Sequence, residues 1–458
     1  MTRTHTSWTR RPVAWILALL LAPASLAFGI SDEEIFRDFP FNVVNPGARA
    51  LGLGGAFISL ADDSTAAQAN PAGLVALRRP ELFAELRAQR YETSSISTSG
   101  TVSDTFFQGD LTTSAVSEPD SILSPTFISY VIPFKRVALG FSRLESLNTQ
   151  TRTSNVFAIS GTEAIVGVEP ETGDPIIIGT EPVDLELTAD ADVDASIIQY
   201  NFALAFDLHR RFSLGLTGVV GTADIRGRVD NLFVDLTGGP FSQPTLDYST
   251  RIDDSDIDYA YNVGLLWRPA DWMSVGAVYR QGLRLVVEET IADTGARAQQ
   301  AQSLFGASFE NVLHTPDSYG LGISFRPSEP WTILVDVVNL EYSDLLEDYV
   351  SGLNRISFPS DRVEFTVDDG NEYHAGLERI FLAGTTPIAM RLGAWSDPDH
   401  RIRAAESSGL QAAFPAGERV THYTAGFGMT LKQTIQIDFA ADISSVNSSF
   451  VVSTIYGF

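Results

Sequence analysis

Beyond residue 80 the chain repeats one pattern of hydrophobic and polar positions. Segments of about ten residues alternate apolar with polar or small side chains, as between residues 435 and 444, where Ile435, Ile437 and Phe439 alternate with more polar neighbours. Successive side chains of a strand point to opposite faces, so the alternation predicts strands with one apolar and one polar face.

Fourteen such segments follow one another, an even number, as bacterial membrane barrels require. They span residues 81–92, 125–133, 136–148, 193–208, 211–224, 257–268, 272–287, 317–327, 331–343, 371–382, 386–396, 421–431, 434–445 and 448–458. Because a tilted strand crosses a membrane with about 9–11 residues, the pattern predicts an all-β fold, a transmembrane antiparallel β-barrel of about 14 strands over residues 81–458. A water-soluble sandwich would show the same alternation and stays open as an alternative.

Short and long connections between these segments alternate. The long ones cover residues 93–124, 155–192, 225–256, 288–316, 344–370 and 397–420. Such asymmetry predicts short turns at the periplasmic end and long polar loops outside. The acidic stretches 190–194 and 253–258 are expected to be solvated loops, with calcium sites as the alternative.

The first 27 residues have the pattern of a secretory signal peptide. Basic residues precede an apolar run from Val13 to Leu21, and small residues then lead to an expected cleavage after Ala27, with Ala24 as second choice. No later stretch has the ~20 apolar residues of a membrane-spanning helix, which excludes a helical membrane protein. Residues 28–80 then form an appendage to one large domain.

Charge and cysteine content narrow the function classes. The chain has 31 Lys+Arg against 57 Asp+Glu, and loss of the three arginines of the leader leaves 28 − 57 = −29. A phosphate backbone would be repelled by this surface, so nucleic acid is excluded as a partner. The chain has no cysteine, so an exported protein of this sequence must be held by backbone pairing and packing.

The appendage contains a glycine-rich stretch, LGLGGAFISLADDSTAAQANPAG, at residues 51–73. A dinucleotide loop needs a third glycine where Phe57 stands, and no Gly-Lys-Ser/Thr follows for a phosphate loop. The small residues instead allow close packing of a backbone against a wall. We therefore expect a plug inside the barrel, either a moving gate or a fixed stopper.

This stretch resembles the N-terminal region of the FadL family, outer-membrane transporters of long-chain fatty acids and aromatic hydrocarbons. The resemblance covers residues 45–56, 61–63 and 70–73, and a second region at 315–336. It implies a hatch over residues 28–80, with Asn70, Pro71 and Ala72 near the barrel wall. Accessory barrels of secretion systems share much of the first motif, so a non-transporting barrel remains the alternative function.

The chain ends on a predicted strand with Tyr456 and the terminal Phe458. This end resembles the signal by which the assembly machinery recognises outer-membrane barrels. The expected location is therefore the outer membrane of a Gram-negative bacterium, with membrane lipid and the assembly machinery as partners.

Apolar residues in two expected outer loops are candidates for ligand capture. Leu232, Phe233 and Leu236 lie in one loop, and Phe305 and Phe309 in another have the spacing of a helical face, together with the apolar residues 312 and 313. A groove for fatty acids or hydrocarbons and simple packing of loops on each other are both consistent with this pattern.

Three arginines are expected to face the lumen by strand parity, namely Arg280, Arg284 and Arg391. A guanidinium could bind the carboxylate of a fatty acid. The alternative is that these arginines neutralise lumenal acids such as Asp336 or Asp438.

The third predicted strand shows a phase slip, since Val137, Leu139 and Phe141 share one parity and Leu144 takes the other, near Gly140. The slip predicts a bulge or inward kink at Gly140. Members of the FadL family have a kinked third strand that opens a lateral window, so the resemblance implies a lateral exit here.

An enzyme would need a nucleophile or metal constellation. His314, His374 and His422 fall near the outer ends of alternate strands, about 10 Å apart, too far to share one metal. No serine stands in a nucleophile motif. The sequence thus predicts transport of hydrophobic compounds without catalysis, metal or cofactor.

Overall fold

The computed structural model of the chain describes residues 44–91, 94–103, 107–117, 121–168, 175–237, 243, 245–292, 294–295, 298–348, 364–404 and 416–458. The expected signal peptide lies outside these residues.

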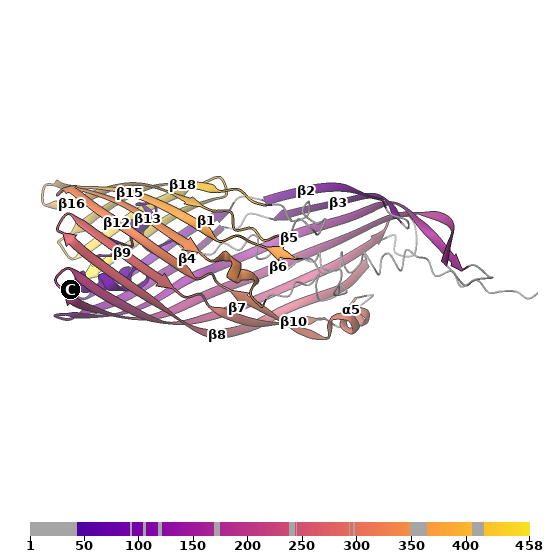
Figure 1. The fold of residues 1–458 in the computed structure, drawn as a ribbon, viewed down its shortest axis with the longest axis horizontal. Helices are drawn as coiled ribbons and strands as arrows, with labels where there is room; N and C mark the ends of the chain where they lie inside the picture. The colour runs from indigo at the N-terminus through magenta and orange to yellow at the C-terminus, as the bar shows by residue number, and fades with distance from the viewer. Residues whose placement is uncertain are drawn as a thin grey trace, which may run out of the picture.

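Fourteen antiparallel strands close into a barrel (Figure 1). In order around the wall they are β1 (Glu81–Tyr91), β4 (Ser121–Pro133), β5 (Val137–Val168), β6 (Pro175–His209), β7 (Phe212–Asp235), β8 (Thr245–Ala270), β9 (Met273–Arg280), β12 (Ser318–Ser328), β13 (Trp331–Leu340), β15 (Gly370–Ala383), β16 (Thr386–Asp397), β18 (Val420–Leu431), β19 (Ile435–Ile443) and β20 (Asn447–Gly457). Each pairs with the next, and β20 pairs with β1. The prediction of about 14 strands is confirmed.

The remaining elements are short. They are the strands β2 (Ser94–Ser103), β3 (Phe107–Ser117), β10 (Arg284–Ile291), β11 (Ser308–His314), β14 (Phe365–Thr366) and β17 (Arg403–Ala404), and the helices α3 (Ala48–Leu51), α4 (Ala66–Ala69), η1 (Pro71–Ala76), α5 (Ala298–Phe305) and η2 (Tyr342–Leu346). Within the described ranges no helix combines the length and the apolar composition needed to cross a membrane.

The two ends of the barrel differ. At one end, named the short-turn end, two or three residues join β4 to β5, β6 to β7, β8 to β9, β12 to β13, β15 to β16 and β18 to β19. At the other end, named the long-strand end, β5 to β8 run on for 32, 35, 24 and 26 residues in total. Because a membrane crossing needs only about 9–11 residues, these strands extend well beyond it, together with β2 and β3 (Figure 1).

The long strands correct the sequence prediction of loops at 155–192 and 225–256. Residues 183–197 of β6 alternate without interruption, with apolar Val183, Leu187 and Val193 buried and acidic Asp190 and Asp192 exposed. The acidic stretches 190–194 and 253–258 accordingly lie on strands β6 and β8, not in loops. Exposed and less exposed positions alternate in these polar stretches with the period of two of a strand, so each stretch continues its strand.

The outward face changes character along the barrel. Between the short turns and the middle of the strands it is apolar, with Leu321 64% and Leu392 63% exposed. An exposed apolar band of this kind is the lipid-facing surface of a membrane barrel. On the extension of β6 the outward face is charged, as at Asp190 and Asp192, and the inward face is apolar.

The expected kink at Gly140 is misplaced. Gly140 pairs regularly with Val131 of β4 and Ala203 of β6, and the register shift of β5 lies between Glu145 and Leu147. Gly140 is required for another reason, since a Cβ at this position would lie 3.0 Å from Cδ1 of Leu74. The Leu144 side chain is buried and has the same parity as Gly140, which lies on the inward face of β5. The change of parity therefore comes after Leu144, at the register shift.

The predicted strand 272–287 is two strands, β9 and β10, separated at residues 281–283. The break exchanges the inward and outward sets, so Leu283 and Leu285 are buried and Arg284 is exposed. The parity that the sequence used to group Arg284 with Arg280 is therefore broken at residues 281–283. The helical face expected around Phe309 is wrong, because residues 308–314 form β11 and pair with β10.

Candidate functional site

Residues 44–80, which we call the N-terminal segment, contact the inward side chains of the wall. Its backbone amides are bonded by wall side chains: Ala48 N–H donates to Ser453 Oγ (3.2 Å), Gly54 N–H to Thr424 Oγ1 (3.0 Å), and Phe57 N–H to Asp336 Oδ2 (2.7 Å). These acceptors lie on β20, β18 and β13. The segment thus has its polar backbone groups satisfied by several wall strands at once, as a buried irregular segment must.

Wall glycines allow the close approach of this segment. A Cβ on Gly393 would lie 2.2 Å from the nitrogen of Gly54, and one on Gly426 would lie 3.1 Å from Cα of Gly52. A Cβ on Gly276 would likewise lie 2.4 Å from the carbonyl oxygen of Ile58. The glycine-rich stretch singled out in the sequence is therefore matched by glycines at inward wall positions, which the strand pattern alone did not indicate.

Asn70, Pro71 and Ala72 lie against β7 and β8. The amide of Asn70 is fully buried, and its Nδ2 donates to the carbonyl oxygens of Ile58 (2.9 Å) and Leu265 (3.0 Å), the second of which belongs to the wall strand β8. Its Oδ1 accepts from Ala72 N–H (3.2 Å), and Ser213 Oγ donates to the Ala72 carbonyl (2.9 Å). The motif joins two parts of the segment to two wall strands.

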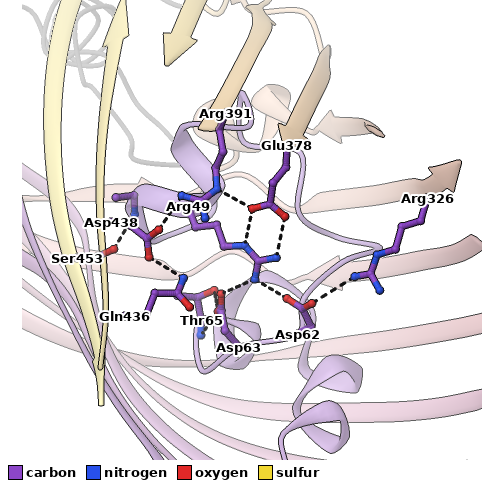
Figure 2. Close-up of polar contacts among 11 residues, drawn as sticks. Arg49, Asp62, Asp63, Thr65, Arg326, Glu378, Arg391, Gln436, Asp438 and Ser453 are labelled. Carbon is purple, nitrogen blue, oxygen red and sulfur yellow. Dashed lines mark hydrogen bonds and ion pairs between the residues drawn. The ribbon is translucent and has the colours of Figure 1, made fainter. Parts of the chain in front are cut away.

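A charged network joins the N-terminal segment to the wall near the short-turn end (Figure 2). Arg49 contacts Asp62 (Nη1–Oδ1, 2.6 Å), Asp63 (Nη1–Oδ2, 3.4 Å) and Glu378 of β15 (Nε–Oε2, 3.3 Å). Arg326 of β12 approaches Asp62 at 3.5 Å. Glu378 pairs in the ladder with Thr332, directly after the turn before β13, which places the network at this end.

Burial and charge oppose each other in this network. Burial by itself lowers the pKa of the Arg49 guanidinium. The carboxylates of Asp62, Glu378 and Asp63 together raise this pKa by more, so it lies well above its ordinary value. Burial raises the pKa of the Asp63 carboxyl, and the charge of Arg49 counteracts this. Arg49 therefore remains a cation and the attachment of the segment is ionic.

The three candidate headgroup arginines are bonded within the protein. Arg391 donates to Glu378 Oε2 (Nε, 2.7 Å) and to Asp438 Oδ1 (Nη1, 2.6 Å) and is buried. Arg280 donates to the carbonyl oxygens of Gln68 and Ala69 of the N-terminal segment, at 3.3 and 2.8 Å. Arg284 contacts Asp348 at 3.2 Å, and both side chains are exposed. Asp438 thus accepts from Arg391, as the neutralisation alternative proposed.

Two of the candidate histidines flank a tryptophan in the wall. The Trp395 ring of β16 stacks on His422 (centroids 3.8 Å apart) and on His374 (5.7 Å). His374 Nδ1–H donates to the Gly54 carbonyl (2.7 Å), and its Nε2 contacts Glu372 at 3.0 Å. The indole separates the two imidazoles; His374 attaches the N-terminal segment, whereas His422 Nδ1 contacts Asp442 Oδ1 at 3.1 Å.

Three carboxylates, Asp317, Glu341 and Asp344, form the one group within the described residues whose oxygens lie within 4.8 Å of one another. Asp317 accepts from Tyr279 Oη and from Gly282 N–H (2.7 Å), and Asp344 accepts from Asp317 N–H (3.0 Å). The acids are thus engaged in holding the start of β12.

An apolar cluster fills the lumen on the other side of the N-terminal segment. We call it the lumenal apolar cluster; it joins Ile58 of the segment to buried residues of β5 to β11, β13 and η2, among them Ile197, Val219, Leu285 and Val338. Val338 pairs with Glu372, six residues along β13 from Thr332 and farther from the short turns. The segment therefore presents Arg49 to the charged network near the short-turn end and Ile58 to the lumenal apolar cluster, and Arg280, at the far end of β9, is bonded to its Gln68 and Ala69 carbonyls.

The predicted capture residues do not form one groove. Phe233 lies on β7 and packs with Phe157 and Leu187, whereas Phe309 lies on β11 and packs with Tyr248 and Ile291. Leu232 is also on β7, and Leu236 follows that strand and is exposed. Phe305 is the last residue of α5. Phe233 and Phe309 thus belong to two separate apolar clusters.

The wall has an interruption between β4 and β5. Pairing of these strands ends at Phe127 with Leu144, and residues 145–152 of β5 have no ladder partner on that side among the described residues, until β3 pairs from Thr153. Pro125 lacks the N–H that would continue the ladder. Arg143 Nη1 donates to the Pro125 carbonyl at 2.6 Å across this place.

A closed barrel with an apolar outer band and a chain segment inside the lumen defines a class, the outer-membrane transport channels. The family model described as outer membrane protein transport protein (OMPP1/FadL/TodX) matches residues 187–452, more than half of the chain. The chain belongs to this family, whose members are channels for hydrophobic compounds in the bacterial outer membrane and are not enzymes.

Solved structures share the fold at low sequence identity. A Pseudomonas aeruginosa FadL homologue is 14% identical with a TM-score of 0.62, over 91% of this chain and 99% of that chain. The Pseudomonas putida toluene transporter TodX is 12% identical (TM-score 0.53) and the Ralstonia pickettii toluene transporter TbuX 13% identical (0.51), each over 91% of this chain and 99% of the other. No curated protein matches the chain.

Proposed function

We propose that the protein carries hydrophobic compounds, long-chain fatty acids or hydrocarbons, across the outer membrane. The ligand is captured at the long-strand end, enters the lumenal apolar cluster, and leaves sideways between β4 and β5. The observation that supports this proposal is the polarity of the N-terminal segment, which presents Ile58 to the apolar cluster and Arg49 to the short-turn end.

A straight passage would be costly for an apolar ligand. It would have to part Arg49 from Glu378 and Asp62, and Arg391 from Asp438. Leaving one member of a buried ion pair without its partner costs about 3–5 kcal/mol. The segment therefore acts as a hatch that is closed toward the periplasm by charge.

A sideways exit avoids this network. Beside the interruption of the wall lie the apolar side chains of Phe83, Phe127 and Leu144, which pack together and with Ile455. Phe83 also approaches the N-terminal segment, where a Cβ on Gly47 would lie 3.5 Å from its ring. These apolar contacts favour a hydrophobic ligand over water, and the exit also passes the ion pair of Arg143 with Glu145 (3.3 Å).

The test is uptake of a labelled long-chain fatty acid and a labelled alkane by a deletion strain with and without the gene. Restoration of uptake of either compound supports transport. Equal uptake in both strains, with the folded barrel present in the outer membrane, would overturn the proposal. Copurification of a stoichiometric protein partner in that case would favour the accessory barrel.

A further inference from the structure

Strand β10 leaves the wall and lies on the lumen face of β7 and β8. A Cβ on Gly221 of β7 would lie 2.2 Å from Cδ1 of Leu283, so that side chain rests directly on the glycine. Gly221 pairs in the ladder with Asp258 of β8, and Asp258 Oδ2 accepts from the N–H of the next residue, Arg284, at 2.7 Å. The start of β10 thus covers this cross-strand pair from inside.

Aspartate side chains attach β10 to β8 in place of backbone carbonyls. Besides Asp258, Asp256 Oδ2 accepts from Val286 N–H and Asp254 Oδ2 from Glu288 N–H, both at 2.8 Å. The β8–β9 ladder ends at Asn262 with Arg280, and the β8–β10 ladder begins only at Ile252 with Glu289. Between these points the three carboxylates are spaced two residues apart, in step with the amides they bind.

Side chains also hold the β10–β11 pair at the end where β10 begins and β11 stops. Gly282 N–H donates to Asp317 Oδ1 (2.7 Å), and Leu283 N–H to Thr315 Oγ1 (2.8 Å). The side-chain attachments of residues 282–288 can be exchanged for water without parting a backbone ladder, whereas residues 289–291 stay paired with β8. The part of the β10–β11 pair before Glu289 can therefore move relative to β8 at lower cost than a wall strand.

Beneath β10 lies an apolar bed. Leu283, Leu285 and Val287 are 1%, 0% and 3% exposed. They share the lumenal apolar cluster with Ile197 of β6 and with Val219 and Ile225 of β7. A hydrocarbon chain that replaced these three side chains would bury the same apolar surface of β6 and β7.

The edge of this bed disfavours an anionic ligand. Asp254, Asp256 and Asp258 lie along it, whereas Arg280 is bonded to the N-terminal segment and Arg284 to Asp348. A carboxylate headgroup would be repelled by the three acids.

We propose that the β10–β11 pair is a gate above the N-terminal segment, and that the bed on β6 and β7 binds an uncharged hydrocarbon chain when β10 lifts. This inference rests on the proposed transport function and gives its substrate class as uncharged hydrocarbons rather than fatty-acid anions.

A disulfide between Gly221→Cys and Leu283→Cys tests the gate. The chain has no cysteine, so oxidation and reduction of this pair act on one bond only. The expected result is loss of most alkane uptake when the pair is oxidised and its recovery on reduction. The control pair is Leu377→Cys with Leu392→Cys, exposed direct partners in the β15–β16 ladder, for which oxidation should leave uptake unchanged.

The two proposals fail in different ways. If the wild-type protein restores no uptake, the transport function is wrong. If wild type and control transport alkane and the oxidised 221–283 pair does so equally well, with the disulfide confirmed by mass spectrometry, transport stands and the gate is wrong.

The substrate class has its own test. Replacement of Asp254, Asp256 and Asp258 by Asn keeps an oxygen acceptor at each position and removes the charges. The ratio of fatty-acid to alkane uptake, measured with chains of equal length, should be low in wild type and rise in the triple variant. A wild type that prefers the fatty acid, or a ratio unaffected by the substitutions, would overturn the assignment.

Discussion

At the residue scale, the side chains of Asn70 and Arg49 make the attachment of the N-terminal segment specific. Asn70 offers two donors and an acceptor, and all three are used, by Ile58, Leu265 and Ala72. Arg49 acts similarly through charge, with bonds to both the segment and β15. Small residues elsewhere in the segment allow the approach, and these two side chains fix it.

We expect Asn70→Ala to loosen the N-terminal segment without unfolding the barrel. The variant leaves buried carbonyl oxygens without donors, at about 1–3 kcal/mol each. Hydrogen–deuterium exchange should be faster within residues 44–80 and unchanged in β18 and β19. Asn371→Ala, which removes an exposed amide, is the control, and equal exchange in both variants would contradict the role of Asn70.

We expect Gly264→Ala to be destabilising, because the new Cβ would lie 2.2 Å from Asn70 Oδ1 and 2.8 Å from Pro71 Cδ. Overpacking of this kind costs about 1–3 kcal/mol. Gly218→Ala is the matched control on the neighbouring strand, since nothing lies within 4 Å of its Cβ. Urea unfolding of the purified barrel should give a lower midpoint for Gly264→Ala than for Gly218→Ala. Equal midpoints would show that the N-terminal segment shifts to accommodate the added methyl group without loss of stability.

At the element scale, the alternation of side chains predicted the wall strands but not their full length or their breaks. A period of two is a local property, so each strand could be recognised alone. The break at residues 281–283 depends on Thr315 and Asp317, which bond to it from the connection between β11 and β12. The strand parity therefore holds for the buried Arg391, whereas it is interrupted between Arg280 and Arg284.

The interruption between β4 and β5 leads to a prediction at this scale. Pro125→Val restores an N–H and a side chain that favours strands, so β4 should pair further with β5 and uptake should fall several-fold. Pro387→Val in β16, where pairing with β15 is continuous, should leave uptake unchanged. Normal uptake by the Pro125 variant, with the added pairing verified by amide protection, would exclude this exit.

At the scale of the whole molecule, closure brings the first and the last wall strands together. β1 and β20 pair over their length, and Phe458 N–H donates to the Pro80 carbonyl at 3.1 Å. The terminal ring also stacks on Tyr130, with centroids 6.1 Å apart. The last residue thus takes part in the seam that completes the barrel.

We expect Phe458→Ala to lower the amount of folded barrel in the outer membrane several-fold, because it removes the terminal aromatic and its stacking at the seam. Heat-modifiable migration of outer-membrane fractions on gels measures the folded amount. Phe450→Ala, which removes an exposed ring of the same strand, should have little effect. Similar losses in the two variants would mean that the terminal position has no special role in assembly.

The sequence by itself determined the number of wall strands, the parity of most of them, and the resemblance to the FadL family, because these follow from local periodicity and contiguous motifs. Tertiary structure alone decided which side chains meet. Arg49 and Glu378 are 329 residues apart, and the aspartates of β8 bind β10 only because the break after β9 turns that strand inward. Such contacts depend on which strands become neighbours when the barrel closes and on what fills its lumen, and neither is written in any short stretch of the chain.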